Sequence, residues 1–102
     1  LPESLFGSGA FYILRARGDS MKDAGIHEKD LVVIQKQETA KVGDIVVALI
    51  GDNENTLKRF GGLDEEGYAI LEYQNEEVYP EKIIRVRDLI VQGVAKHVIK
   101  SL

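Results

Sequence analysis

The sequence has no cysteine and no tryptophan, and it has only two prolines and one methionine among 102 residues. The absence of cysteine excludes disulfide bonds, thiolate metal sites and thiol nucleophiles, and it is compatible with a reducing compartment. No apolar run approaches the roughly 18 residues of a membrane-spanning helix, and no basic segment precedes an apolar one as in a secretory leader. We therefore expect a cytoplasmic domain without membrane contact.

Charge of one sign is not concentrated in any part of the chain. The sequence has 13 basic and 17 acidic residues, a formal net charge of −4 and an isoelectric point near 5.1. Affinity for nucleic acid requires clustered lysine and arginine, so this domain is not expected to bind DNA or RNA by itself. Hydrophobic residues make up 44% of the chain, which is enough to bury one core.

Short apolar or alternating segments, separated by turn-forming residues, predict about seven strands and no long amphipathic helix. We expect a mainly β single domain, partly barrel-like, with one short helical turn. Gly61-Gly62 and residues 64–67 predict a chain reversal, and residues 74–81 predict an acidic surface loop. The predicted strands cover residues 11–17, 31–35, 45–50, 56–60, 68–73, 82–86 and 89–99.

The last predicted strand has two interpretations. Gly93 in its middle predicts a bulge or bend. Its apolar residues Val94, Val98 and Ile99 fit either a sheet edge that pairs with a second copy or an ordinary buried strand. His97, among these residues, is more typical of a structural histidine than of a pH sensor.

Residues 18–30 predict a turn that presents the hydroxyl of Ser20 on exposed backbone. Gly18 permits backbone angles that side chains forbid, Asp19 is a good helix N-cap residue, and Gly25 closes the short helical turn. At a strand-to-helix junction several amide N–H groups lack intrahelical partners, and such groups can stabilise negative charge on a substrate oxygen. A hydroxyl beside free amides is half of a hydrolase site.

The other half is a base, because serine is a poor nucleophile until its proton is removed. His27 and His97 are the only histidines, and neither lies in a recognisable serine–histidine–acid arrangement. Lys58 is the better candidate. Alternation along a strand places it on one face with Thr56 and Phe60, where a small hydroxyl and an aromatic ring would give the amine a dry niche.

Two other features have structural interpretations. Asp19, Asp23, His27 and Asp30 contain metal-ligand atoms, but acidic residues in turns usually cap and solvate backbone, so we expect no metal and no cofactor. Met21, the only methionine, either plugs the core below the turn or lines the cleft.

Four motifs in order resemble the C-terminal domain of the LexA repressor family of self-cleaving serine–lysine peptidases. Gly-Asp-Ser-Met-Lys-Asp-Ala-Gly-Ile at 18–26 and Thr-Leu-Lys-Arg-Phe at 56–60 are similar to the nucleophile and base motifs of the family. The stretches at 29–34 and 43–48 are similar as well, and the resemblance covers roughly residues 11–100. Ser20 and Lys58 are 38 positions apart, close to the spacing in the family.

The resemblance implies site residues and a mechanism. Neutral Lys58 would be the general base for the Ser20 nucleophile, and the backbone amides of Ser20 and Met21 would stabilise the oxyanion. Thr56 would orient the amine. The bond cut would be an Ala-Gly bond in the protein's own linker. The only such bond here is Ala24-Gly25, inside the turn, so we expect this chain to cut only another molecule.

The resemblance also implies a repressor of the DNA-damage (SOS) response. Residues 1–10 would be a lead-in or linker remnant, and residues 11–102 the peptidase and dimerisation domain. Because the chain begins without methionine, we expect a processed or truncated piece whose N-terminal partner is missing. The resemblance implies that this partner is a DNA-binding domain. That domain would bind operator DNA, and RecA filaments on single-stranded DNA would stimulate the cleavage.

The sequence is also compatible with alternative functions. A UmuD-like subunit of a translesion polymerase shares the peptidase core and uses cleavage to activate a partner. Phage repressors of the same build are another option. A catalytically silent β module would only dimerise, and it should be indifferent to the loss of Ser20 or Lys58.

Overall fold

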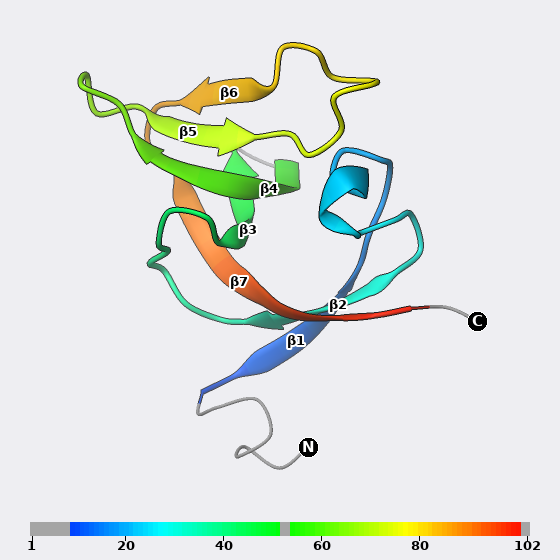
Figure 1. The fold of residues 1–102 in the computed structure, drawn as a ribbon. Coiled ribbons are helices and arrows are strands. Elements are labelled where there is room, and N and C mark those ends of the chain that lie inside the picture. The colour runs from blue at the N-terminus through cyan, green and yellow to red at the C-terminus, as the bar shows by residue number, and fades with distance from the viewer. Residues whose placement is uncertain (1–8, 52–53, 101–102) are drawn as a thin grey trace.

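The computed structural model describes residues 9–51 and 54–100, which form seven strands and one short 3-10 helix (Figure 1). The sequence-based prediction of a mainly β domain is confirmed, and two predicted strands, 31–35 and 45–50, agree with the structure at both ends. The elements are β1 (Phe11–Arg15), η1 (Lys22–Ala24), β2 (Leu31–Gln35), β3 (Ile45–Ile50), β4 (Glu54–Leu63), β5 (Ala69–Glu72), β6 (Ile83–Val86) and β7 (Ile90–Ile99).

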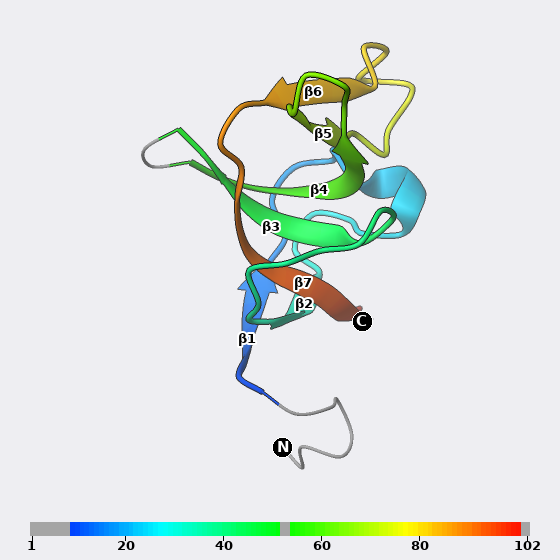
Figure 2. The same cartoon turned by 90° about the vertical axis from the view of Figure 1, so that its left-hand side faces the viewer.

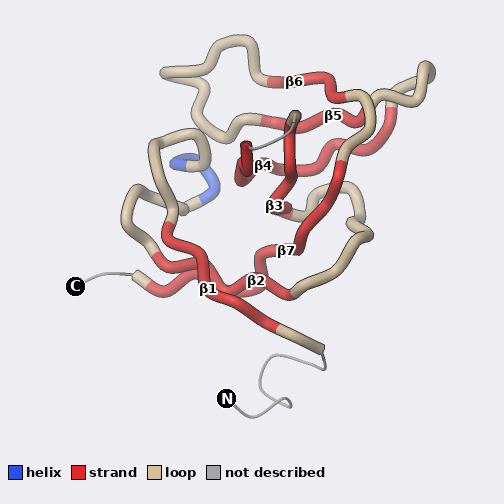
Figure 3. The backbone as a smooth tube through the Cα atoms, turned by 180° about the vertical axis from the view of Figure 1, so that it is seen from behind, coloured by secondary structure: helices blue, strands red, loops and turns tan. Residues whose placement is uncertain are grey.

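All seven strands belong to one antiparallel sheet in the order β1-β2-β7-β3-β4-β5-β6. The sheet is strongly curved, so that β1 lies at one end of the molecule and β6 at the other (Figure 2). Seen from behind, the helical turn η1 lies to one side, between the β1–β2 end and the β4–β5–β6 end (Figure 3). The turn after β1 is thereby brought close to β4.

Alternation along β3 divides the apolar core into two clusters. Val47 points into one cluster, while Val46 and Ala48 point into the other, because successive side chains of a strand lie on opposite faces. The first cluster also contains Met21 and Ile26 from the turn after β1. Burial of these two side chains therefore fixes that turn against the sheet.

Each of the two interpretations of the last strand holds for one part of it. In the sheet order β7 lies between β2 and β3, but β3 pairs with residues 90–94 and β2 with residues 94–99, so Val98 and Ile99 have a strand partner on one side only among the described strands. The bulge predicted at Gly93 is confirmed by a register shift between the pairs Val47–Gly93 and Ala48–Val91. A Cβ atom at Gly93 would lie 2.3 Å from Ile34 Cγ2, so only glycine allows this close approach of strands. The far end of β7 is exposed, including His97.

Of the reversal predicted from Gly61-Gly62 and residues 64–67, the part at 64–67 is confirmed and the part at the two glycines is wrong. Both glycines lie within β4, where a register shift bends the strand between Phe60 and Leu63. The reversal comes later: the Asp64 carboxylate accepts hydrogen bonds from the Glu66 and Tyr68 amides. Of the predicted lead-in at residues 1–10, the first eight residues lie outside the described part of the chain.

Candidate active site

Ser20 lies in the turn between β1 and η1, as the sequence predicts. Gly18 has a φ of 75°, and Gly25 ends the helical turn at φ 84° while its amide donates to the Lys22 carbonyl. The prediction that Asp19 is the N-cap is wrong. Met21 occupies that position without a side-chain cap bond, and Asp19 contributes its backbone carbonyl, which accepts from the Lys22 amide.

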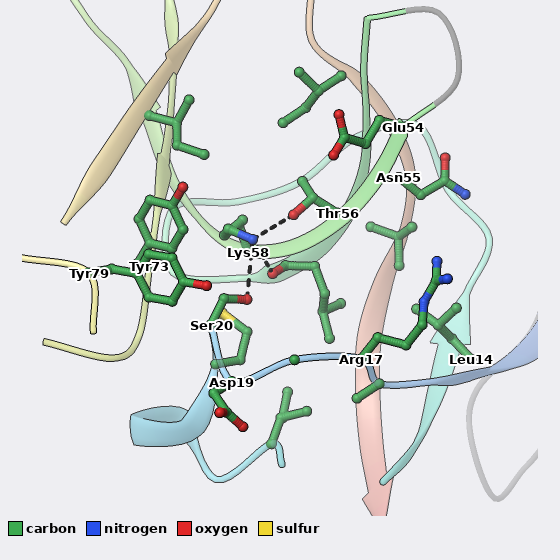
Figure 4. Close-up of a pocket in the computed structure, with 18 of the residues that line it drawn as sticks. Leu14, Arg17, Asp19, Ser20, Glu54, Asn55, Thr56, Lys58, Tyr73 and Tyr79 are labelled. Carbon is green, nitrogen blue, oxygen red and sulfur yellow. Dashed lines mark hydrogen bonds between the residues drawn. The ribbon is translucent and has the colours of Figure 1, made fainter. Parts of the chain in front are cut away.

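Lys58 extends from β4 toward Ser20, and the two side chains meet (Figure 4). Its Nζ donates to Ser20 Oγ at 3.2 Å, to Thr56 Oγ1 at 2.5 Å and to the Leu57 carbonyl at 3.3 Å. The expected proximity of Thr56 to the amine is therefore observed. These three hydrogen bonds fix the position of the Lys58 amine beside the Ser20 hydroxyl.

The surroundings of Lys58 favour the neutral amine. The residue is only 6% exposed, and all three of its hydrogen-bond partners are uncharged. Burial lowers the pKa of the Lys58 ammonium, and the Glu54 carboxylate opposes part of this effect. A lysine with a lowered pKa is available as a base at a less alkaline pH than an exposed one.

The aromatic ring beside the amine is Tyr73, whose centroid is 5.0 Å from Lys58 Nζ. Tyr79 stacks on Tyr73 with ring centroids 4.2 Å apart. The expectation that Phe60 provides the dry niche is not what the structure shows: Phe60 packs against the second core cluster. Sequence reasoning missed both tyrosines, because Tyr73 ends the predicted strand 68–73 and Tyr79 lies in the segment predicted to be a surface loop.

The β5–β6 loop, residues 73–82, holds the serine turn in place. The Gln74 amide donates to the Ser20 carbonyl at 2.8 Å, and the Asp23 amide donates to the Gln74 carbonyl at 2.6 Å. Asn75, which is 2% exposed, donates its side-chain amide to the Asp19 carbonyl at 2.8 Å. This segment is thus not only an acidic surface loop, and it forms a wall of the site.

The backbone amides of Ser20 and Met21 are the groups expected to form an oxyanion hole. Within residues 9–51 and 54–100, no hydrogen bond is donated by the Ser20 or Met21 N–H group. Such groups can bind a developing negative charge. The Met21 side chain fulfils both of its sequence-based interpretations, since it is buried in the first core cluster and also lines the cleft.

A cleft of about 480 Å³ opens over Ser20 and Lys58. One wall is the backbone from Leu14 to Met21, and the opposite wall is the β4 segment 54–58 together with the two tyrosines (Figure 4). The ladder that joins β4 to β5 runs from Arg59 to Leu63, so residues 54–58 are paired with β3 alone among the described strands. This edge can accept an extended peptide through main-chain hydrogen bonds.

The acidic residues of the turn have structural partners. Asp30, 5% exposed, accepts from the His27 amide at 2.8 Å and from Lys100 Nζ at 2.5 Å. In the part of the chain that the structure describes, no three His, Cys, Asp or Glu side chains are grouped as metal ligands. Its helical segment is also too short to span a membrane.

A hydroxyl, a buried amine and two amide donors at the edge of a peptide-sized cleft define the class of serine peptidases that use lysine as base. The sequence matches the family described as Peptidase S24-like over residues 1–96, and the chain belongs to this family. LexA repressors from two strains of Cereibacter sphaeroides are 47% identical to the chain over 90 residues. The matched region covers 85% of this chain and 39% of each repressor, so the chain spans about two fifths of these relatives.

Proposed function

We propose that this chain is the self-cleaving peptidase and dimerisation domain of a LexA-type repressor, with Ser20 as nucleophile and Lys58 as general base. The observation that carries the proposal is the 3.2 Å contact between Lys58 Nζ and Ser20 Oγ, at a buried amine that has no carboxylate partner among the described residues. A solvated lysine would be charged near neutral pH and could not accept the serine proton. The similarity to LexA repressors supports the same assignment.

The reaction begins when neutral Lys58 accepts the proton of Ser20 Oγ and the oxygen attacks the alanine carbonyl of an Ala-Gly bond. The carbonyl oxygen becomes negatively charged, and the amides of Ser20 and Met21 stabilise it. The Lys58 ammonium then gives its proton to the glycine nitrogen, and the peptide bond breaks. Water, deprotonated by Lys58, hydrolyses the acyl-enzyme. Thr56 holds the amine in line through its 2.5 Å contact.

The proposed role of the whole protein extends beyond this chain. An N-terminal domain binds operator DNA, and RecA filaments on single-stranded DNA stimulate cleavage by favouring the state in which the linker lies in the cleft. The protein acts in the cytoplasm. It forms a homodimer, and the outer end of β7 supplies apolar surface for this contact, since Val98 and Ile99 are 37% and 46% exposed.

Cleavage of one molecule by another tests the proposal. This chain is mixed with the full-length protein carrying Ser20→Ala, and cleavage of the linker is followed by mass spectrometry. We expect one cut at an Ala-Gly bond, and no cut when the added chain carries Ser20→Ala or Lys58→Ala. If cleavage is absent, or if it persists with both variants, the domain is a dimerisation module without this activity.

A further inference from the structure

Asn75 is a buried polar residue that no step of the proposed mechanism uses. Its Nδ2 donates to the Asp19 carbonyl at 2.8 Å, and its Oδ1 accepts from the Val78 amide at 3.3 Å. Its own carbonyl accepts from the Tyr79 amide at 2.9 Å. The Asn75 side-chain amide thus joins Asp19, the residue before Ser20, to the β5–β6 loop, which carries Tyr73 and Tyr79. A buried amide with both ends bonded fixes the groups around it.

The bond to the Asp19 carbonyl determines the direction of the Ser20 N–H group. A peptide bond is planar, so the carbonyl of one residue and the N–H of the next lie in one rigid plane and point in opposite directions. Asn75 Nδ2 and the Lys22 amide both donate to this carbonyl, at 2.8 Å and 3.2 Å. While the carbonyl is held from the loop side, the direction of the Ser20 N–H group is held as well.

The next peptide plane is held in the same way. The Gln74 amide donates to the Ser20 carbonyl at 2.8 Å, which fixes the plane that ends in the Met21 N–H. Two consecutive residues of the β5–β6 loop therefore orient two consecutive N–H groups of the serine turn. The first contact uses a side chain and can be removed by substitution, whereas the second uses only backbone.

We propose that Asn75 is a positioning residue that aims the Ser20 N–H at the reacting oxygen by holding the Asp19 carbonyl in the same peptide plane. The inference rests on the proposed function, because it makes Asn75 responsible for the direction of the Ser20 N–H group, one of the two proposed oxyanion donors. Asn75 does not touch the substrate. It acts through the backbone. Loss of its side-chain amide changes the direction of the Ser20 N–H donor but does not remove this donor.

A fluorophosphonate probe tests the inference on this chain without a peptide substrate. Ser20 Oγ attacks phosphorus while its proton passes to Lys58, the O–P bond forms, and fluoride leaves as the P–F bond breaks. The phosphoryl oxygen occupies the place of the peptide oxyanion. The maximal labelling rate and the half-saturating probe concentration are measured at pH 9 for wild type, Asn75→Asp, Gln74→Ala and Ser20→Ala.

Asn75→Asp keeps the shape and the acceptor for Val78 but places a carboxylate oxygen against the Asp19 carbonyl. We expect its maximal rate to fall at least about tenfold, because removal of an oxyanion donor typically costs 10²–10³ and misaiming it costs less. The half-saturating concentration should stay within about twofold. Gln74→Ala is the matched control, since its side chain bonds only to the Tyr73 carbonyl while its backbone contacts remain.

A structural role for Asn75 would lower the melting temperature without slowing the labelling of the folded protein. Labelling is therefore measured well below the melting temperature of each variant, and the Ser20 amide is followed by ¹⁵N NMR. In wild type, that proton should move downfield on phosphonylation, and the movement should be smaller in Asn75→Asp. A wild-type rate for Asn75→Asp overturns the inference, whereas failure of wild type to label more than Ser20→Ala overturns the proposed function.

Discussion

Two lysines contact the serine turn, and they differ in their partners. Lys58 extends from β4 to the start of this turn at Ser20. It is buried, and its amine bonds to three uncharged oxygens. Lys100 reaches the end of the turn from the last residues of the chain, is 53% exposed, and bonds to the Asp30 carboxylate and the Gly25 carbonyl. The same residue type thus serves two purposes within one turn.

The difference in partners accounts for the different roles that we propose for the two lysines. A carboxylate stabilises an ammonium, so Lys100 forms an ion pair with Asp30 that connects the end of β7 to the turn. The hydrogen bond from Lys100 is the main cause that lowers the pKa of Asp30. Lys58 is buried and has no countercharge in contact within residues 9–51 and 54–100, which favours loss of its proton. Placement of a lysine near a serine is therefore not sufficient for chemistry. The absence of a carboxylate partner is the additional requirement, and substitutions can exchange the two environments.

The largest effect is expected for Lys58→Met, which removes the amine and keeps much of the side-chain volume. Labelling of Ser20 by the fluorophosphonate should fall about 10³-fold, within the range that general bases contribute. The melting temperature at pH 7 should rise by several degrees, because the lowered pKa of Lys58 makes folding costly while the unfolded lysine is protonated.

The pH dependence of the increase in melting temperature provides a control for the Lys58→Met prediction. Stability of wild type rises as the pH rises from the folded-state pKa of Lys58 toward the ordinary value of 10.5, since the unfolded chain binds more protons in that range. The advantage of Lys58→Met should therefore shrink at alkaline pH. A lower melting temperature for Lys58→Met at pH 7 would show that the charged amine stabilises the fold.

The next largest effect is expected when Lys58 receives a carboxylate partner. Thr56→Asp places one beside Nζ, where the hydroxyl now lies at 2.5 Å. The carboxylate should raise the pKa of Lys58 and slow Ser20 labelling at pH 8 at least about tenfold, with partial recovery at higher pH. Thr56→Asn is the isosteric neutral control. Equal rates and equal pH profiles for the two variants would mean that charge beside the amine is irrelevant.

Substitutions at Asp30 and Lys100 should affect stability more than reactivity. Asp30→Asn and Lys100→Met are each expected to lower the melting temperature at pH 7 by a few degrees, while labelling of the folded protein stays within about twofold of wild type. Because the folded-state pKa of Asp30 lies below 3.8, its contribution is present above that value and is lost as the pH falls through the folded-state pKa.

The melting curves of Asp30→Asn and wild type should therefore converge in acid. A calorimetric or circular dichroism series from pH 7 to pH 2 measures this. A constant difference between the two proteins over the whole range would show that the carboxylate charge is not the stabilising feature.

The smallest effect is expected for Lys22, whose amine lies 3.7 Å from Glu77 across the same turn and loop. Both side chains are largely exposed, and such pairs contribute about 0–1 kcal/mol. Lys22→Ala should change the melting temperature by less than about 4 °C. A double-mutant cycle with Glu77→Ala measures the coupling, and a large coupling would mean that surface charge, not buried hydrogen bonding, holds the loop to the turn.

Much of the fold follows from local sequence signals. The apolar run at 45–50 predicts β3 at its observed bounds, and the glycines that flank the serine turn predict its left-handed positions. The contact between Ser20 and Lys58 was predicted from two motifs far apart in the chain. Strand pairing was harder to predict, because an apolar strand such as β7 has the same alternation at an edge as in the middle of a sheet.

The least predictable part of the site was the loop around Asn75. Its hydrogen bond to Asp19 joins residues 56 positions apart, and its acidic neighbours are typical of a solvated loop. No local pattern distinguishes a buried asparagine from an exposed one. The same holds for Tyr73, which follows β5 directly and contacts Lys58 of the neighbouring strand β4.

The rate of Ser20 labelling as a function of pH tests the central claim most directly, since it reports the protonation state of Lys58 in the folded protein. Measured from pH 6 to pH 11 with the fluorophosphonate, the rate should rise through one ionisation with a midpoint below 10.5, and this rise should be absent in Lys58→Met. A flat profile between pH 7 and pH 10, or a rise that persists in Lys58→Met, would contradict the role of Lys58 as the base.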